Sequence, residues 1–165
     1  MCYNLKVARV YLETSFFSAC ATTRTDVDSQ SWKGRSLSWL KTQASRHELL
    51  ISAEVIAELS APNYPMRDVA LQFTVGIELL PIHEEVLAPA QMLIDSRVMP
   101  GPLKGDAIHV AVAAYHGAEY LLSWNVKHLA NPRKRVHLAQ ILMTAGKAVP
   151  TIVTPDVLWE EESDG

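Results

Sequence analysis

Four side chains that can ligate a metal ion stand where apolar runs of this chain end or where the following helix is expected: Glu13, Glu58, Asp106 and Asn125. Carboxylates brought close together repel each other and raise each other's pKa, unless a cation lies between them. Oxygen ligands without an accompanying set of cysteines and histidines favour a hard ion such as Mg²⁺ or Mn²⁺. Such an ion engages phosphate oxygens and activates a water nucleophile. These residue types therefore predict metal-dependent phosphoryl chemistry, provided that the fold brings them together.

The elements that must position these side chains are predicted from short apolar runs that alternate with longer helical patterns. Strands are expected over 7–12, 49–51, 77–82 and 119–124, with a small strand near Ile152. Helices are expected directly after the first strand and over 31–47, 53–59, 66–73, 84–97, 106–116 and 133–144, and a last helical turn over 155–159. Pro89 is expected either to kink its helix or to mark a later start for it.

The order of these elements predicts the fold class. Strands that are nearly all apolar and alternate with helices indicate a parallel sheet covered on both faces. Right-handed crossovers then give an α/β fold, a three-layer α/β/α sandwich with a central parallel sheet. In such folds ligands bind outside the carboxyl ends of the strands. The four candidate ligands are therefore expected at one edge of one sheet, although they come from four separate parts of the sequence.

Length and cysteine content bound the class of protein. The 165 residues predict a single domain over 1–165, in which 7–131 carry the motifs and 132–165 add a C-terminal helix and strand. The only cysteines, Cys2 and Cys20, have no C-x-x-C spacing. They indicate neither a zinc site nor a disulfide framework, and they fit a reducing cytoplasm best. No stretch resembles a signal peptide or a membrane span.

The net charge of −3 counts mildly against a nucleic-acid partner, because phosphate binders usually carry a basic surplus. A site built from several carboxylates would lower this total while leaving basic patches elsewhere. The run Arg133-Lys134-Arg135 is such a patch, and it could either be a solvated helix face or bind phosphate.

Each candidate ligand also has a plain structural interpretation. Glu13 could be solvated at a strand end, Asp106 could be a helix N-cap, and Asn125 could be a turn residue. Glu58 competes with Glu54, which lies one helical turn earlier on the same face. The helix dipole favours any acid in the first turn, so Glu54 has a structural reason for its charge and Glu58 is the preferred ligand.

Four segments resemble the PIN-domain nucleases, in particular the VapC-type ribonucleases of bacterial toxin–antitoxin pairs. They are YLETS at the end of the first strand, ISAEVIAEL after the second, GDAIHVAVAAYHGAEYLLSWN, and KHLAN. The resemblance covers roughly 7–131, and the stretch 106–131 is its most specific part. It implies a parallel α/β/α sandwich that uses Mg²⁺ or Mn²⁺ and cleaves single-stranded or structured RNA. It also implies a homodimer held silent by an antitoxin protein.

The resemblance assigns a family position to each candidate ligand. Glu13 stands at the first acidic position, normally an aspartate, and Glu58 stands at the glutamate of the helix after the second strand. Asp106 corresponds to the third acid, and Asn125 to the fourth, which is commonly an aspartate. A glutamate at position 13 adds one methylene, about 1.5 Å of reach, so a metal must lie further out. An asparagine at position 125 removes a charge, which weakens a second metal site but keeps an oxygen ligand.

Histidines and aromatic residues near these positions favour structural roles. His109, His116 and His128 lack the tight spacing of a zinc site, and His109 is expected to be a hydrogen-bonded core residue. Trp124, Lys127 and His128 flank the predicted edge and could meet RNA bases or phosphates. Packing or solvent exposure is the simpler role for each of these three.

Three functions compete at this point. The first is a metal-dependent endoribonuclease that hydrolyses RNA phosphodiester bonds, the toxin of a type II toxin–antitoxin pair, with Thr14 or Ser15 orienting the water or the metal shell. The second is a catalytically weak PIN-like module that binds RNA or a protein, because Glu13 and Asn125 depart from the family pattern. The third is a receiver-type phospho-protein, which needs an aspartate after a central strand, and the sequence places none there.

Overall fold

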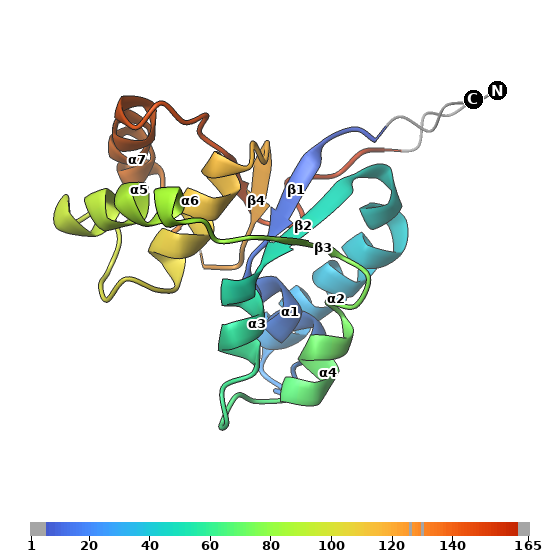
Figure 1. Ribbon diagram of the computed structural model, residues 1–165. Coiled ribbons are helices and arrows are strands. Elements are labelled where there is room, and N and C mark those ends of the chain that lie inside the picture. Colours follow the sequence, from blue (N-terminus) through green and yellow to red (C-terminus); the bar gives the residue numbers. More distant parts are fainter. Residues whose placement is uncertain (1–5, 126, 130, 162–165) are drawn as a thin grey trace.

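A computed structural model describes residues 6–125, 127–129 and 131–161, which form a five-stranded parallel sheet between two layers of helices (Figure 1). The sheet order is β3-β2-β1-β4-β5, and every neighbouring pair is parallel. The strands are β1 (Arg9–Leu12), β2 (Glu48–Ser52), β3 (Glu78–Leu80), β4 (Tyr120–Leu122) and β5 (Thr151–Val153). The predicted parallel sheet is therefore confirmed, and the C-terminal strand belongs to the same sheet.

The helices divide between the two faces of the sheet. Helices α1 to α4 pack on one another on one side, and α5 to α7 pack on one another on the other side (Figure 1). Their bounds are α1 (Thr14–Ala21), α2 (Val27–Thr42), α3 (Ala53–Leu59), α4 (Arg67–Gln72), α5 (Glu84–Asp95), α6 (Asp106–Tyr115) and α7 (Pro132–Thr144), with a short 3-10 helix η1 (Ala44–Arg46). The three-layer α/β/α sandwich is confirmed. Among the described residues, no helix is both long and apolar enough to cross a membrane.

The strand order reverses between β1 and β4, and this reversal creates the crevice in which ligands of such sheets bind. From β1 the chain winds outward through β2 to β3, then returns to place β4 and β5 on the other side of β1. The register pairs Leu12 with Leu122, so the segments after β1 and β4 begin side by side. This order differs from the 2-1-3-4-5 order of receiver domains, which removes the receiver-type alternative.

Helix α6 explains why its sequence is apolar on nearly every face. Residues 107–114 are all buried, because the helix lies between the sheet and α5. His109 is fully buried within this stretch and must therefore find hydrogen-bond partners inside the protein. The predicted core role of His109 is confirmed. Cys20, 2% exposed, is also part of the core.

The helix predicted over 31–47 is wrong at both ends, because α2 runs from Val27 to Thr42 and the separate 3-10 helix η1 follows it. Helix α2 begins at Val27 rather than Ser31, because Asp26 caps it by accepting a hydrogen bond from the Ser29 N–H at 3.0 Å. This first turn is largely exposed, so it lacks the apolar spacing on which the prediction relied. Pro89 lies inside α5, which begins at Glu84, so it does not mark a later start.

The predicted helical turn over 155–159 is a single hydrogen-bonded turn, from the Val157 N–H to the Thr154 carbonyl oxygen at 3.0 Å. The segment is held instead by α2: the indole N–H of Trp39 donates to the carbonyl oxygen of Leu158 at 2.7 Å. Trp39 is fully buried and also packs edge to face against Phe16. Gln43 adds two hydrogen bonds to the backbone of Glu160, at 3.1 and 2.8 Å, so the buried indole is one of several contacts that fasten the C-terminal segment to α2 and the residue after it.

Trp39→Phe should lower the free energy of unfolding by about 1–3 kcal/mol, because it leaves the Leu158 carbonyl oxygen without its donor and leaves space around a smaller ring. Urea denaturation followed by circular dichroism measures the loss. Trp159→Phe is the matched control, since Trp159 is 41% exposed, and its effect should stay within about 0.5 kcal/mol. Equal effects of the two substitutions would contradict the anchoring role of Trp39.

Candidate metal and phosphoryl-transfer site

Glu13 is a buried carboxylate that follows β1 directly and caps α1. It is 5% exposed, so its charge must be balanced by hydrogen-bond donors. Its Oε2 atom accepts hydrogen bonds from the Ser15 N–H at 3.1 Å, from the Ser123 hydroxyl at 2.8 Å and from the Ser15 hydroxyl. These donors come from the first turn of α1 and from the residue after β4. The carboxylate thus joins the two segments that leave the strand-order reversal.

Asp106 opens α6 at the same edge. Gly105 is the residue that caps this helix, with a φ of 65° that favours glycine, so the interpretation of Asp106 as the N-cap is wrong. Asn125 donates from its side-chain amide to Asp106 Oδ2 at 3.2 Å, and its own oxygen accepts from the His128 N–H at 3.3 Å. Asn125 therefore bridges the segment after β4 to the start of α6.

Glu58, on α3, reaches the same region and is paired with the buried ring of His109. The Thr14 hydroxyl also donates to Glu58 Oε1, at 2.9 Å. The other ring nitrogen of His109 shares a hydrogen bond of 2.7 Å with the Tyr11 hydroxyl, which in turn lies 2.7 Å from the Ser52 hydroxyl. This chain of hydrogen bonds links β2, β1, α6 and α3, and it fixes the direction from which Glu58 approaches.

Glu54, the competing glutamate, has a different partner. Its Oε1 accepts a hydrogen bond of 2.8 Å from the Gly105 N–H, immediately before Asp106. Glu54 therefore ties α3 to the start of α6, whereas Glu58 contacts side chains that lie at the strand edge. The preference for Glu58 as a ligand remains a prediction, and the contacts give the two glutamates separate tasks.

The pKa shifts show how the charges at this edge are balanced. Burial would raise the pKa of Glu58, but the hydrogen bond and the charge of His109 and the Thr14 hydroxyl bring it below its ordinary value. Burial would lower the pKa of His109, but the hydrogen bond to Glu58 and the charges of Glu13 and Glu58 raise it. Burial raises the pKa of Asp106, and the negative charges of Glu13 and Glu58 raise it further. Asp106 therefore carries the least compensated charge of these groups.

The residues fit a hard cation in donor type and in charge. Glu13 Oε1, Glu58 Oε2 and Asp106 Oδ1 accept no hydrogen bond from the described residues, so each carboxylate keeps one oxygen unengaged. Burial first, and then the negative charges of Glu13 and Glu58, raise the pKa of Asp106, and a cation at this edge would offset those charges. As the side chains stand, no three His, Cys, Asp or Glu residues in the described ranges converge closely enough to hold an ion. Asn125 presents its amide nitrogen, not its oxygen, to Asp106.

The sequence did not reveal the residues that hold these carboxylates in place. Ser123 donates to Glu13, and Tyr11 and Ser52 orient His109, although their sequence separations reach 110 residues. Two sequence signals pointed toward this network. Ser52 comes directly after a predicted strand, and Tyr11 carries a hydroxyl within a predicted apolar strand. Thr14 and Ser15 donate to Glu58 and Glu13, so both hydroxyls already position carboxylates.

The flanking residues have separate surroundings. Trp124 is 6% exposed and stacks on Trp32, with ring centroids 5.3 Å apart, so packing is its role. Lys127 and His128 are exposed. In the basic patch, Arg135 donates to the carbonyl oxygen of Ile152 at 3.3 Å.

Comparison with solved structures finds chains with a similar fold at low sequence identity. The chain is similar to VapC20 of Mycobacterium tuberculosis, described as a sarcin-ricin loop cleaving toxin, with 15% identity, a TM-score of 0.54, and coverage of 73% of this chain and 93% of that one. FitAcB from Neisseria gonorrhoeae gives 16% identity and a TM-score of 0.53, with coverage of 90% and 99%. The chain has a PIN-like fold. VapBC2 from Rickettsia felis, bound to a DNA fragment from its promoter, gives 16% identity and a TM-score of 0.50, covering 75% and 93%.

These likenesses concern the fold. No protein-family model matches the sequence, and no curated protein matches it. The chain spans nearly the whole length of each structure compared.

The His109–Glu58 pair should make stability depend on pH in a metal-free buffer that contains EDTA. The pKa of His109 is raised above 6.5 in the folded protein, so its contribution to stability is full below about pH 6.5 and is lost as the pH rises through the raised pKa. The pKa of Glu58 is lowered below 4.5, so its contribution is present above about pH 4.5 and is lost on acidification. The pair therefore contributes most between these two values.

His109→Gln should lower the free energy of unfolding by about 1–3 kcal/mol at pH 6 and should flatten its decline between pH 6.5 and 8.5. Urea titrations of both proteins across this range measure the difference. Burial also lowers the pKa of His47. Because His47 is the same in both proteins, its contribution to the pH dependence of stability cancels in the comparison. Parallel curves for the two proteins would show that His109 is not charged in the fold.

Proposed function

We propose that this protein is a metal-dependent endoribonuclease that hydrolyses RNA phosphodiester bonds and is the toxin of a type II toxin–antitoxin pair. The observation that carries the proposal is that Glu13, Asp106, Asn125 and Glu58 gather where the strand order of a PIN-like sheet reverses. The similarity in fold to VapC20, a toxin described as cleaving the sarcin-ricin loop, supports RNA as the substrate class.

Glu13, Asp106, Glu58 and Asn125 are the residues that would hold Mg²⁺ or Mn²⁺. When bound, such an ion supplies charge neutralisation at the phosphate and a more acidic water. The protein's own groups set the positions of these ligands. Ser15 and Ser123 fix the Glu13 carboxylate, Asn125 fixes Asp106, and His109 fixes Glu58. Such fixed supporting contacts are what metal sites require of the residues around their ligands.

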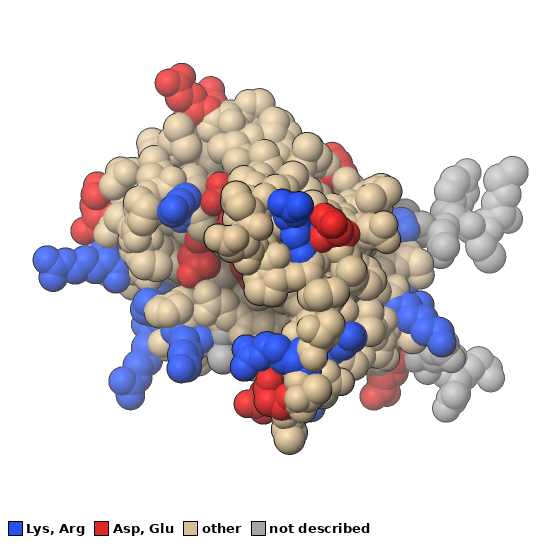
Figure 2. All heavy atoms as spheres, turned by 90° about the horizontal axis from the view of Figure 1, so that it is seen from below, with Lys and Arg blue, Asp and Glu red and all other residues tan. Residues whose placement is uncertain are grey.

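The charge distribution on the face of the molecule where the strands β1 and β2 end supports an anionic substrate. Figure 2 views the molecule from below, the direction in which β1 and β2 run in Figure 1. Acidic side chains lie within a hollowed part of this face, and lysine and arginine side chains lie around it (Figure 2). A basic surround attracts a phosphate backbone while the acids at the centre remain available for a cation. This arrangement reconciles a net charge of −3 with a nucleic-acid substrate.

Partners follow from the same proposal. The similar structures include the complexes VapBC2 and FitAcB, which supports an antitoxin protein as a partner of this chain. The proposal includes a homodimer in the cytoplasm, where the RNA substrate is found. Size-exclusion chromatography with light scattering tests the dimer independently of any activity.

Asp106→Asn should reduce RNA cleavage by more than about 100-fold. Removing only a hydrogen-bonding partner of a metal ligand costs up to about 100-fold in activity, and this substitution changes a proposed ligand itself. Cleavage of a 5′-labelled single-stranded RNA by the purified protein with Mn²⁺ measures the effect. Glu58→Gln should also lose most activity. Glu54→Gln is its matched control on the same helix, because a glutamine oxygen still accepts from the Gly105 N–H. Cleavage that survives in the Asp106→Asn protein would refute the assignment of the site.

A catalytically weak PIN-like module that binds RNA or a protein is the second candidate. It is favoured by two observations: Glu58 is already paired with His109, and Asn125 turns its amide nitrogen toward Asp106. The first contact gives the Glu58 charge a partner other than a metal, and the second turns the Asn125 oxygen away from Asp106. Metal binding itself therefore discriminates the two functions.

Asn125→Asp should raise the affinity for Mn²⁺ by about tenfold or more, while lowering the metal-free free energy of unfolding by about 1 kcal/mol, because it replaces a hydrogen bond to Asp106 with a repulsion. Calorimetric titration with Mn²⁺ and urea denaturation in EDTA measure the two effects. Asn131→Asp adds the same charge at the N-cap of α7, where asparagine and aspartate are equivalent. If Asn125→Asp binds Mn²⁺ no better than this control, the binding module is the correct function.

A further inference from the structure

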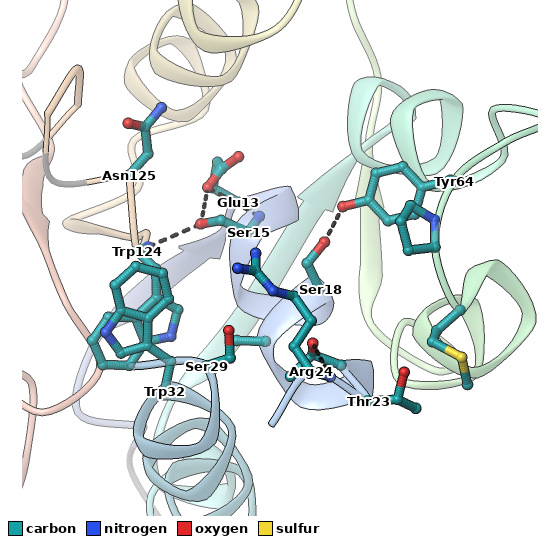
Figure 3. Close-up of a pocket in the computed structure, with 14 residues that line it drawn as sticks. Glu13, Ser15, Ser18, Thr23, Arg24, Ser29, Trp32, Tyr64, Trp124 and Asn125 are labelled. Atoms are coloured by element: carbon teal, nitrogen blue, oxygen red, sulfur yellow. Dashed lines mark hydrogen bonds between the residues drawn. The ribbon is translucent and has the colours of Figure 1, made fainter. Parts of the chain in front are cut away.

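A pocket of about 530 Å³ opens directly beside the candidate metal site, and Glu13 and Asn125 form part of its lining (Figure 3). This volume lies within the range of sites that bind small organic groups, about 300–1,000 Å³. One face of α1, with Ser15, Ser18 and Ala19, forms a wall of small side chains. Their spacing of three and one residues places them on the same side of the helix, which is why space is left there.

Aromatic rings line the pocket on two sides of this face. Trp32 stacks on Trp124 with an interplanar angle of 12°, and the indole N–H of Trp124 donates to the Ser36 hydroxyl at 2.8 Å, which fixes the pair. Trp32 is 38% exposed and so retains accessible ring surface. Tyr64 lies across the pocket, where its hydroxyl is hydrogen-bonded to the Ser18 hydroxyl (Figure 3). Both walls are therefore held in place without a ligand.

Arg24 adds a positive charge to this lining. In Figure 3 its side chain lies between the tryptophan pair and Tyr64. It forms an ion pair of 3.2 Å with Asp26, but both side chains are well exposed, and such surface pairs contribute little. The guanidinium group therefore remains available for a phosphate, to which it can donate two parallel hydrogen bonds.

We propose that this pocket binds one unstacked base of single-stranded RNA next to the phosphate that is cleaved, with the base against Trp32 and an adjacent phosphate at Arg24. The inference rests on the proposed function, and it assigns to that site a binding subsite for the base. Stacking on fixed aromatic rings is how proteins hold the bases of single strands, because every base has an aromatic face.

The test compares binding of a labelled uridine 12-mer with binding of a 12-mer that keeps the sugar–phosphate backbone but lacks the bases. Fluorescence anisotropy is measured in EDTA with the Asp106→Asn protein, so that cleavage does not interfere. The base-bearing strand should bind about tenfold more tightly, as expected for stacking of one base. Equal binding of the two strands would overturn the proposal. This comparison requires no substitution in the pocket itself.

Trp32→Ala, added to this protein, should reduce the preference for the base-bearing strand to about twofold or less. Trp32→Phe keeps an aromatic face and should restore most of the preference, which a merely structural role of Trp32 would not predict. Trp159→Ala is the matched control, since Trp159 is 41% exposed and does not line the pocket. Arg24→Gln should weaken binding of both strands equally, because it removes a phosphate contact. If Trp32→Ala keeps the full preference for the base-bearing strand, the proposal is overturned, and a polypeptide becomes the next candidate occupant of the pocket.

The outcomes separate this inference from the proposed function. Base-dependent binding that requires Trp32, in a wild-type protein that cleaves no RNA, supports the subsite and refutes the nuclease. RNA cleavage by wild type with an unchanged KM in Trp32→Ala supports the nuclease and refutes the subsite. Absence of binding to both strands refutes the subsite and, if cleavage is also absent, the nuclease as well.

Discussion

The burial of one carboxylate, Glu13, is the constraint around which this edge of the protein is built. A charge that is 5% exposed is costly unless donors surround it, and those donors must come from structure that is itself fixed. The parallel register supplies them: because Leu12 pairs with Leu122, the next residues along each strand, Glu13 and Ser123, emerge together. The first turn of α1 supplies the rest through Ser15. Pairing of β1 with β4, capping of α1 and burial of the charge are therefore mutually dependent.

The remaining charges at the edge are balanced unequally. Glu58 has a buried histidine as its partner, and the pKa shifts of both groups favour the charged pair. Asp106 has only the amide of Asn125, and burial together with its acidic neighbours raises its pKa. A cation that enters this edge gains most from Asp106 and Glu13. The charge of Glu58 would be shared between the cation and His109. The contribution of Glu58 to cation binding therefore depends on how far its interaction with His109 is weakened.

Sequence patterns predicted the architecture because it depends on local signals that the chain repeats. Apolar runs of strand length separated by helices fixed the three-layer sandwich, and the rule that ligands bind beyond strand ends located Glu13, Asp106 and Asn125 together. The supporting network was beyond such rules. Tyr11, buried in a strand, meets Ser52 and His109 across 41 and 98 residues, and no local pattern encodes those distances. The first turn of α2 was missed because its Asp26 cap, not apolar spacing, determines where it begins.

Each of the three candidate carboxylates at the edge is held through one oxygen, and its other oxygen accepts no hydrogen bond from the described residues. Glu13 uses Oε2 for three donors, Asp106 uses Oδ2 for Asn125, and Glu58 uses Oε1 for Thr14 and His109. A cation that binds the free oxygens need break none of these hydrogen bonds, but the side chains must first move closer together, and this movement costs part of the binding energy. The extra methylene of a glutamate at position 13 suits this division of its oxygens, because a longer side chain can cap a helix with one oxygen and extend the other toward the edge. The departure from aspartate is therefore compatible with the proposed site, and the pocket beside it is the surface on which we propose that the substrate is held.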